Sequence, residues 1–234
     1  MTKTNSEEGG HLNIEPEMLT RSVRRSDYAR IIESDKEVYP TANPVTEDVL
    51  DQWYKNNPEF GSILEQHNEL RGMCIAIPLT TEAWKKLVSG DVSESELHGS
   101  AIFDASKDNE IGIHIYHLEK SGQSKGFYKD ALWALGEITH RLKRKNPALR
   151  IIGFSGLCTS PQGISLFQNK FNCQERDFVN REYVLRKDGR AEVFHPQSEQ
   201  DLRSKLADGY ECICRCKMLV LYPEEASVVW DYLN

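Results

Sequence analysis

The sequence contains no long hydrophobic run and few cysteines. Its longest apolar runs, such as Met218 to Tyr222, span only a few residues, whereas a membrane-spanning helix needs about 20. Residues 1–15 are polar and acidic, without the apolar core of a secretory signal or the arginine-rich pattern of a transit peptide. Six cysteines in a chain of 234 residues are therefore expected to be reduced thiols rather than a disulfide framework. We expect a cytoplasmic protein with no membrane partner.

Positive charge is also in short supply. The chain has 29 Lys and Arg against 36 Asp and Glu, a net charge of −7. Nucleic-acid binding needs a basic surface, so we expect no nucleic-acid partner. A negative balance is compatible with cationic ligands such as amines, although it also serves solubility. Hydrophobic residues make up 39% and charged residues 28%, which is typical of a folded globular protein.

Hydrophobic periodicity separates a tail from an α/β domain. Residues 1–20 lack periodicity and are expected to be a mobile tail. The patterns that follow predict helices at 46–57, 81–88, 125–145, 161–170, 198–207 and 224–233, and strands at 71–78, 98–104, 111–118, 150–157, 181–186 and 210–222. This order predicts an α/β fold with a mixed, mostly antiparallel central sheet flanked by helices over 21–189. A C-terminal β/α extension over 190–234 is expected to pack on this core.

A polar loop containing glycine leads into the longest predicted helix. It follows the strand at 111–118 and reads Gln123, Ser124, Lys125, Gly126, Phe127 and Tyr128. Free backbone N–H groups and the helix dipole make such a loop suitable for a phosphate or pyrophosphate. The loop matches neither the Walker A motif nor the three-glycine dinucleotide fingerprint. Many loops of this kind bind nothing, so the loop by itself leaves both interpretations open.

These residues resemble the coenzyme A loop of the GCN5-related N-acetyltransferase (GNAT) superfamily. The signature of that family is Gln/Arg-x-x-Gly-x-Gly/Ala between its fourth strand and the next helix; Gln123 and Gly126 match it, and Tyr128 departs from it. The order of elements from residue 22 to residue 188 is similar to the family's order. Ser160 to Phe167 stands where the family tends to show Asn-x-x-Ala-x-x-Leu-Tyr, with Leu166 matching.

The resemblance implies an acetyl-CoA-dependent N-acetyltransferase that passes the acetyl group directly from the thioester to a primary amine, with no metal. Acetyl-CoA would lie where the fourth and fifth strands separate. Its pantetheine arm would pair with the backbone of Tyr116, His117 and Leu118, and its pyrophosphate would rest on residues 123–128. Ser160 and Phe167 would border the same cofactor site. Phe167 replaces the tyrosine that usually acts as the acid in this family.

The sequence offers His114 and Glu119 as candidates for the catalytic base. A histidine has an unperturbed pKa near 6.5, which suits removal of a proton from an amine. Tyr128 or Tyr116 could replace the missing acid. Ordinary structural roles for His114 and Glu119 stay open, as does deprotonation through water. An alternative function is a non-catalytic acyl-CoA-binding or sensor module, and a third is an interaction protein that shares only the topology.

Three other features have simpler interpretations. The cysteines at 212, 214 and 216 alternate along a predicted strand and are expected to form one packed apolar face rather than a metal site. The basic run Arg141 to Lys145 is expected to be the solvated last turn of a helix. Cys158 is expected to serve packing. The extension at 190–234 could complete the sheet edge, cover the acceptor site or support a homodimer.

Overall fold

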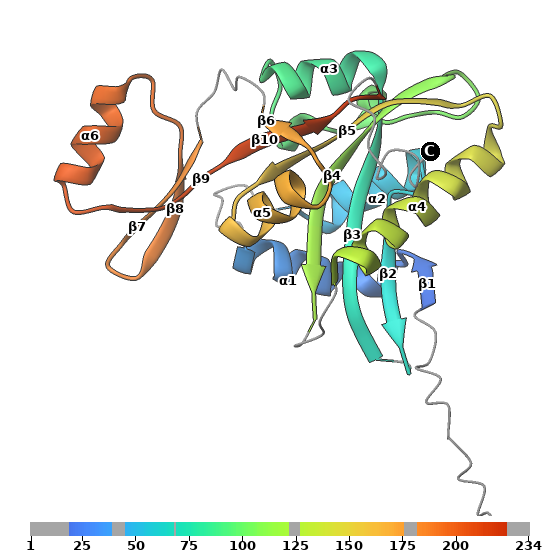
Figure 1. The fold of residues 1–234 in the computed structure, drawn as a ribbon, viewed down its shortest axis with the longest axis horizontal. Coiled ribbons are helices and arrows are strands. Elements are labelled where there is room, and N and C mark those ends of the chain that lie inside the picture. The colour runs from blue at the N-terminus through green and yellow to red at the C-terminus, as the bar shows by residue number, and fades with distance from the viewer. Residues whose placement is uncertain (1–18, 39–44, 68, 122–126, 176–181, 224–234) are drawn as a thin grey trace, which may run out of the picture.

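A mixed seven-stranded sheet carries helices on both of its faces. The computed structural model describes residues 19–38, 45–67, 69–121, 127–175 and 182–223 (Figure 1). The strand order of the large sheet is β1-β2-β3-β4-β5-β10-β6, and β4 and β5 form its parallel pair. The elements of this part are β1 (Leu19–Ser22), α1 (Tyr28–Val38), α2 (Glu47–Asn56), β2 (Gly61–Gln66), β3 (Glu69–Thr80), α3 (Thr81–Ser89), β4 (Glu110–Lys120), α4 (Phe127–Lys145), β5 (Arg150–Cys158), α5 (Pro161–Asn169), β6 (Gln174–Glu175) and β10 (Lys217–Leu221). The predicted fold class is confirmed.

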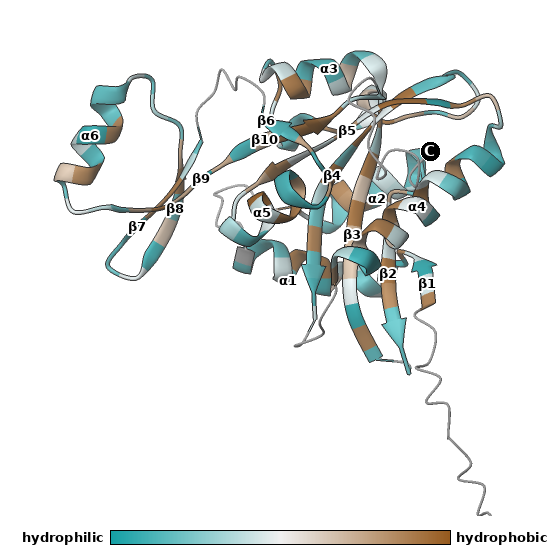
Figure 2. Cartoon of the chain, viewed as in Figure 1, coloured by the Kyte–Doolittle hydropathy of each residue, from teal (hydrophilic) through white to brown (hydrophobic). Residues whose placement is uncertain are grey.

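The two faces of the sheet form two hydrophobic cores. Alternate residues of β3 point to opposite sides, so Cys74 and Ala76 join the core under α4 and α5, while Ile75 and Ile77 join the core under α1, α2 and α3. In Figure 2 the hydrophobic colour follows the strands and the helix faces turned toward them. None of the helices in the described ranges is long and apolar enough to cross a membrane.

Helix α4 confirms the strongest helical pattern in the sequence, but its last turns are not simply solvated. The Arg141 side chain is 10% exposed, and its Nε donates to Glu59 Oε2 at 2.6 Å. Its Nη2 donates to the Gly61 carbonyl at 3.0 Å and to Ser62 Oγ at 2.8 Å. Lys145 approaches the second oxygen of Glu59 at 3.2 Å. The expectation of a solvated basic run was therefore wrong for Arg141, which ties α4 to the start of β2.

Two predicted strands differ in the structure. Residues 98–104 form a 3-10 turn, η3 (Gly99–Ala101), in which Gly99 has a φ of 57°, and only Ile102 makes an isolated bridge, to Leu79. Ile102 and Phe103 are nevertheless buried, which explains the strand-like apolar pattern. The predicted strand at 210–222 is two strands in different sheets, β9 (Glu211–Arg215) and β10, which separate at Cys216. Strands β1 and β2 were not predicted.

A small second sheet lies beside the large one. It has the order β8-β7-β9, and its elements are β7 (Tyr183–Lys187), β8 (Arg190–Phe194), α6 (Glu199–Ala207) and β9. Asp188 and Gly189, with φ of 50° and 76°, form the tight turn between β7 and β8. In Figure 1 this unit projects from the side of the molecule next to β10. It lies in the chain between β6 and β10, so neither sheet begins or ends at the expected boundary near residue 189.

Candidate functional site

Strands β4 and β5 pair only over their first halves. The parallel register runs from Glu110–Arg150 to His114–Ser155. Beyond that point β4 continues along β3 as far as Lys120, whereas β5 continues along β10 as far as Cys158. Figure 1 shows β5 turning away from β4 in this region. The edge of β4 that faces β5 therefore carries backbone groups after His114 that are not used in that pairing, which suits an extended ligand.

A β-bulge lies at the same place on β4. Ile115 pairs with Ala76 and His117 pairs with Ile75, so Tyr116 is an extra residue without a partner on β3. A bulge shifts the alternation of side chains by one residue. As a result His117 and Glu119 lie on the same face as Tyr116, where Ser34 of α1 contacts both of them. Strict alternation would have placed His117 on the opposite face.

Four polar side chains form a chain of contacts at His114 and Ser155, the last residues that pair between β4 and β5. Glu94 belongs to the 3-10 turn η2 (Glu94–Glu96), and its Oε1 is 2.6 Å from His114 Nε2. His114 Nδ1 lies 3.0 Å from Ser155 Oγ, and Trp84 Nε1 donates to that oxygen at 2.9 Å. His114 and Ser155 have no exposed surface. Since Ser155 Oγ accepts the indole N–H, its own proton is free to go to His114 Nδ1, which leaves the Nε2 proton for Glu94.

The residue types match a nucleophilic triad, but the geometry favours a positioning role for Ser155. A serine nucleophile must reach the substrate, whereas this hydroxyl is enclosed by the indole and the imidazole. Glycines at two sites let the indole approach. A Cβ on Gly112 would lie 2.0 Å from Trp84 Cγ, and a Cβ on Gly153 would lie 2.4 Å from Trp84 Cη2. Ser155 thus holds one ring nitrogen of His114, and the other ring nitrogen contacts Glu94.

Carboxyl groups gather on this face of β4. Burial raises the pKa of Glu94, and the nearby Glu182 raises it further, while His114 lowers it. Burial also raises the pKa of Asp35 on α1, which His117 and Tyr116 partly offset. Burial, together with the charges of Glu94 and Asp35, raises the pKa of the Tyr116 phenol. Burial thus makes negative charge costly on this face, and a bound cation would offset that cost.

Glu119 lies in a different environment. Its Oε2 accepts from Ser34 Oγ at 2.5 Å, and its Oε1 lies 3.4 Å from Arg30. The nearby His117, whose Nε2 lies 3.7 Å from Oε2, is the main cause that lowers the pKa of Glu119, and Ser34 and Arg30 add to the effect against burial. Glu119 is thus an ion-paired carboxylate and a weaker base than Glu94. The structure brings His114, Tyr116, His117 and Glu119 to one face of β4, whereas strict alternation would bring only the first two together.

The other predicted site residues lie on the α4 and α5 face. Phe167 is 4% exposed, and its ring lies against Gly156 of β5. A Cβ on Gly156 would be 2.4 Å from Phe167 Cε1 and 3.3 Å from the Ile115 carbonyl oxygen. Phe167 is therefore a core residue whose ring reaches the point where β4 and β5 separate. Ser160 Oγ accepts the Gly163 N–H at 3.1 Å and caps α5. Phe127 and Leu118 pack on the same core.

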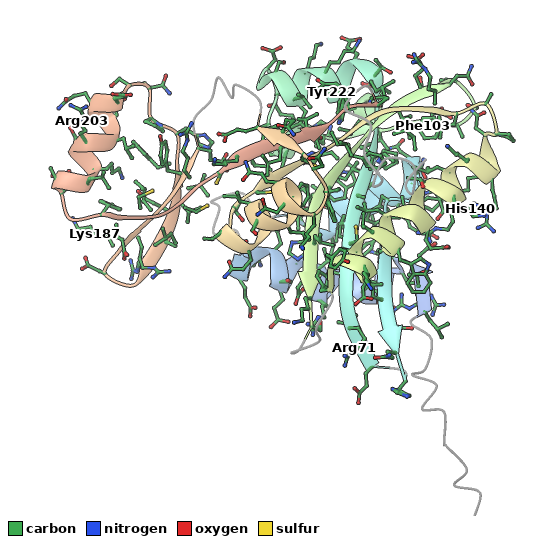
Figure 3. All side chains as sticks on the ribbon, in the orientation of Figure 1. Arg71, Phe103, His140, Lys187, Arg203 and Tyr222 are labelled. Carbon is green, nitrogen blue, oxygen red and sulfur yellow. The ribbon has the colours of Figure 1, made fainter. Side chains whose placement is uncertain are left out.

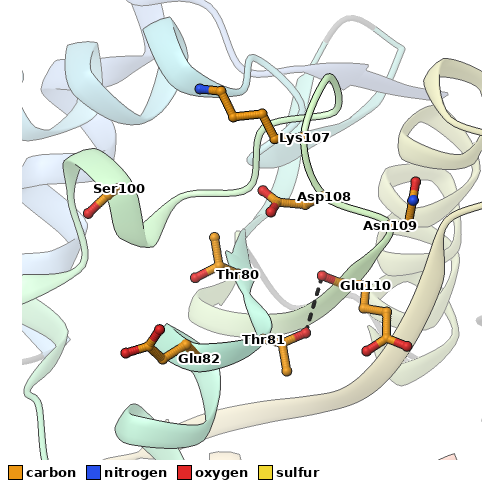
Figure 4. Close-up of a pocket in the computed structure, with 8 residues that line it drawn as sticks. All are labelled: Thr80, Thr81, Glu82, Ser100, Lys107, Asp108, Asn109 and Glu110. Carbon is orange, nitrogen blue, oxygen red and sulfur yellow. Dashed lines mark hydrogen bonds between the residues drawn. The ribbon is translucent and has the colours of Figure 1, made fainter.

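Tyr128 is on the first turn of α4, and Lys170 Nζ lies 5.4 Å from the centroid of its ring. Both residues line a shallow hollow between the start of α4 and α5, together with Pro161, Gln162, Ser165 and Leu166. The predicted phosphate-binding residues Gln123, Ser124, Lys125 and Gly126 lie outside the described residues. A second polar hollow, shown in Figure 4, lies at the opposite end of β4 around Thr81 and Glu110 and does not include the candidate residues.

Sequence reasoning missed Glu94, Asp35, Ser155, Trp84 and Arg71. Arg71, labelled in Figure 3, lies near the start of β3. Its carbonyl accepts the Ser121 N–H at 2.8 Å, and its Nε is buried without a hydrogen-bond partner in the described part of the chain. No motif signals these residues, because their partners are far away in the sequence.

Among the described residues no three Cys, His, Asp or Glu side chains are arranged to hold a metal ion. Cys214 and Cys216 are buried, but Cys212 is exposed, so the expected single cysteine face is divided.

Neither a protein-family model nor a curated protein sequence matches the chain. Solved structures do match. The loading GNATL domain of CurA from Lyngbya majuscula has a TM-score of 0.52 and 10% identity, covering 88% of this chain and 97% of that domain. The chain has the GNAT fold. Arabidopsis thaliana NAA60 in complex with acetyl-CoA (TM-score 0.49, 13% identity, 89% of this chain and 99% of that one) is also similar. So is Arabidopsis thaliana Naa50 with a bisubstrate analogue (0.46, 8%, 87% and 97%).

The family resemblance drawn from the sequence is thereby confirmed at the level of the fold. Within the GNAT fold, the separation of β4 and β5 and the bulge at Tyr116 lie where the sequence analysis expected the cofactor. The small sheet of β7, β8 and β9 is inserted ahead of the strand that lies next to β5. At this level of identity the likeness concerns the fold alone.

Proposed function

We propose that the chain is an acetyl-CoA-dependent N-acetyltransferase that acts directly on a primary amine. The observation that carries this proposal is the end of the β4–β5 pairing at His114 and Ser155, with the bulge of Tyr116 immediately after it. That arrangement would present backbone of β4 with which β5 does not pair to a thioester arm on one side, and a largely buried Glu94–His114 pair on the other. The fold of the structural neighbours supports the same class of reaction.

The cofactor would follow the unpaired edge of β4. Its pantetheine amides would pair with the backbone of Tyr116, His117 and Leu118, and its thioester would lie near Ile115, where the Phe167 ring closes the α5 side. Its pyrophosphate would meet the N-terminus of α4, a helix of 19 residues. Arg71 lies near the end of β4, and its buried Nε has no hydrogen-bond partner among the described residues. It would supply a positive charge suited to a phosphate at that end.

The transfer is a single displacement. The neutral amine attacks the thioester carbonyl, a C–N bond forms, and the C–S bond breaks with release of the thiolate. The proton lost by the amine passes to the Glu94 carboxylate, and His114 shares that charge through the 2.6 Å contact. A base with a raised pKa holds this proton better than Glu119, whose pKa is lowered. We therefore assign the base to Glu94 with His114, and we assign no role as base to Glu119.

Among the described residues no strong acid for the leaving thiolate is evident. Phe167 has no proton to give, and the Tyr128 ring lies beside Lys170 in the hollow between α4 and α5. Burial raises the pKa of the Tyr116 phenol, which makes it a weaker acid. A thiol with a pKa near ~8.5 is a tolerable leaving group without an acid, and general acid catalysis is typically worth about 10²–10⁴-fold. The same observation favours the second candidate function, a binding or sensor module that holds acetyl-CoA without turnover.

Two measurements separate these functions. Coenzyme A should raise the melting temperature of the chain by mass action, and acetyl-CoA with a panel of primary amines should release free thiol. Glu94→Gln should lower kcat about 100-fold or more without a change in coenzyme A affinity. Glu96→Gln is the matched control, because Glu96 belongs to the same turn but its side chain bonds Ser93 rather than His114, and a glutamine can replace it there. Binding without thiol release would support the sensor module, and absence of binding would refute both.

A further inference from the structure

The Asp35 carboxyl is buried and incompletely satisfied. The residue is 3% exposed, and its Oδ2 has no hydrogen-bond partner among the residues that the structure describes. The Tyr116 phenol and the Val45 N–H interact with the carboxyl, and Glu94 and His117 act on it through their charges. Tyr116 is the bulged residue of β4. Asp35 therefore belongs to the same face as the Glu94–His114 pair, beside the point where β4 and β5 separate.

Two half-buried carboxylates elsewhere in the described structure are paired with arginine. Asp27 lies 2.7 Å from Arg21, and Glu59 lies 2.6 Å from Arg141. By contrast, the charged groups that act most strongly on Asp35 in the described structure are His117 and Glu94. Those that act most strongly on Glu94 are His114, Glu182 and His117. Glu182 has His195 at 3.5 Å. A buried carboxylate without a cation is costly, and the described residues place no lysine or arginine among the groups that act most strongly on these two carboxyls.

We propose that the acceptor carries two cationic groups, and that Asp35 binds the second while Glu94 and His114 receive the reacting amine. This inference rests on the proposed function and names its substrate class. A diamine fits the chemistry, because its second ammonium group donates hydrogen bonds to the free Asp35 oxygen and neutralises the carboxylate. A monoamine leaves that oxygen unpartnered. Asp35 is thus a specificity-determining residue for the acceptor rather than a participant in the displacement.

The test is equilibrium binding of unbranched diamines of three to six carbons and of the monoamines of equal length, by calorimetry in saturating coenzyme A. The best diamine should bind at least about 10-fold more tightly than its monoamine, within the roughly 10- to 100-fold range expected for a hydrogen bond to a charged group. Asp35→Asn should bring this ratio close to one. Glu33→Gln should keep it, because Glu33 is an exposed residue of the same helix whose substitution changes the charge equally.

A ratio close to one in the unmodified protein would overturn the inference and would mean that water satisfies the Asp35 oxygen. A ratio preserved in Asp35→Asn would overturn it as well. The comparison in the unmodified protein does not depend on the folding of any variant. The outcome is also distinct from failure of the proposed function, because that failure appears as absence of thiol release with every amine, whereas this test measures binding only.

Discussion

Replacing Ser155 with alanine should destabilise the protein strongly for the loss of one oxygen atom. The hydroxyl accepts the Trp84 indole N–H at 2.9 Å and lies 3.0 Å from His114 Nδ1. Both partners are fully buried, so neither can turn to water in the variant. Each buried group left unsatisfied costs about 1–3 kcal/mol. We expect the free energy of unfolding to fall by about 3 kcal/mol, which corresponds to a melting temperature lower by roughly 6–12 °C.

The assay is a double-mutant cycle in which urea unfolding measures the free energy of unfolding of each variant. Trp84→Phe removes the indole donor, so Ser155→Ala in that background strands only His114. The effects of the two substitutions should therefore fall short of additivity by about 1–2 kcal/mol. Ser62 gives a matched control, because it is equally buried but bonds Arg141 and the Ala134 carbonyl. Ser62→Ala and Trp84→Phe should be additive.

Additive effects of Ser155→Ala and Trp84→Phe would refute the bond between these side chains. The cycle also has a functional readout. If Ser155 fixes the ring of His114, the acid limb of the pH profile of kcat should move in Ser155→Ala, because His114 can turn and exchange the nitrogen that it offers to Glu94. A destabilised variant with an unchanged pH profile would show that the four-residue chain serves only the core.

Three further predictions test other parts of the structure. Phe167→Tyr should keep coenzyme A affinity and raise turnover, because the ring reaches Gly156 where β4 and β5 separate; a lower melting temperature without a gain in rate would show a packing role only. Burial raises the pKa of Asp35 in the folded protein above its unfolded value. Ionisation of Asp35 therefore destabilises the fold as pH rises through the folded pKa. Melting curves should show Asp35→Asn more stable than the unmodified chain at pH 7, with a gain that vanishes in acid. The pKa of Glu59 is raised by burial but lowered overall by Arg141. The free energy of unfolding of Glu59→Gln should therefore be about 2 kcal/mol lower at pH 7. Its urea midpoint should converge with that of the unmodified chain as pH falls through the lowered pKa.

The sequence pattern sufficed for the elements whose periodicity reflects burial on one side. Helix α4 places Ala131, Leu135, Ile138 and Leu142 on the core, which is the spacing read from the sequence. The same reasoning failed at 98–104, because Ile102 and Phe103 are buried from a turn rather than from a strand. It also missed β2, whose residues are buried on both faces and so show no alternation.

The candidate site was predictable only in its backbone. Periodicity and the family resemblance located the end of β4, but the bulge that turns His117 and Glu119 toward α1 depends on the register with β3. Glu94 reaches His114 across 20 positions and Trp84 reaches Ser155 across 71. Contacts of this kind follow from tertiary packing and leave no local pattern. The two base candidates drawn from β4 were therefore incomplete without Glu94, which stands in a polar turn.

Strand β5 shows how the site is built without the usual motif residues. Gly153 admits the Trp84 ring on one face, and Gly156 admits the Phe167 ring on the other. Between them Ser155 is the last residue that pairs with β4. The two rings therefore approach the end of the paired region from opposite sides, one holding the polar chain to Glu94 and the other closing the apolar side. Because small residues on β5 and the bulge on β4 fix this geometry, Phe167 and Ser160 can depart from the family pattern while the separation of the strands persists.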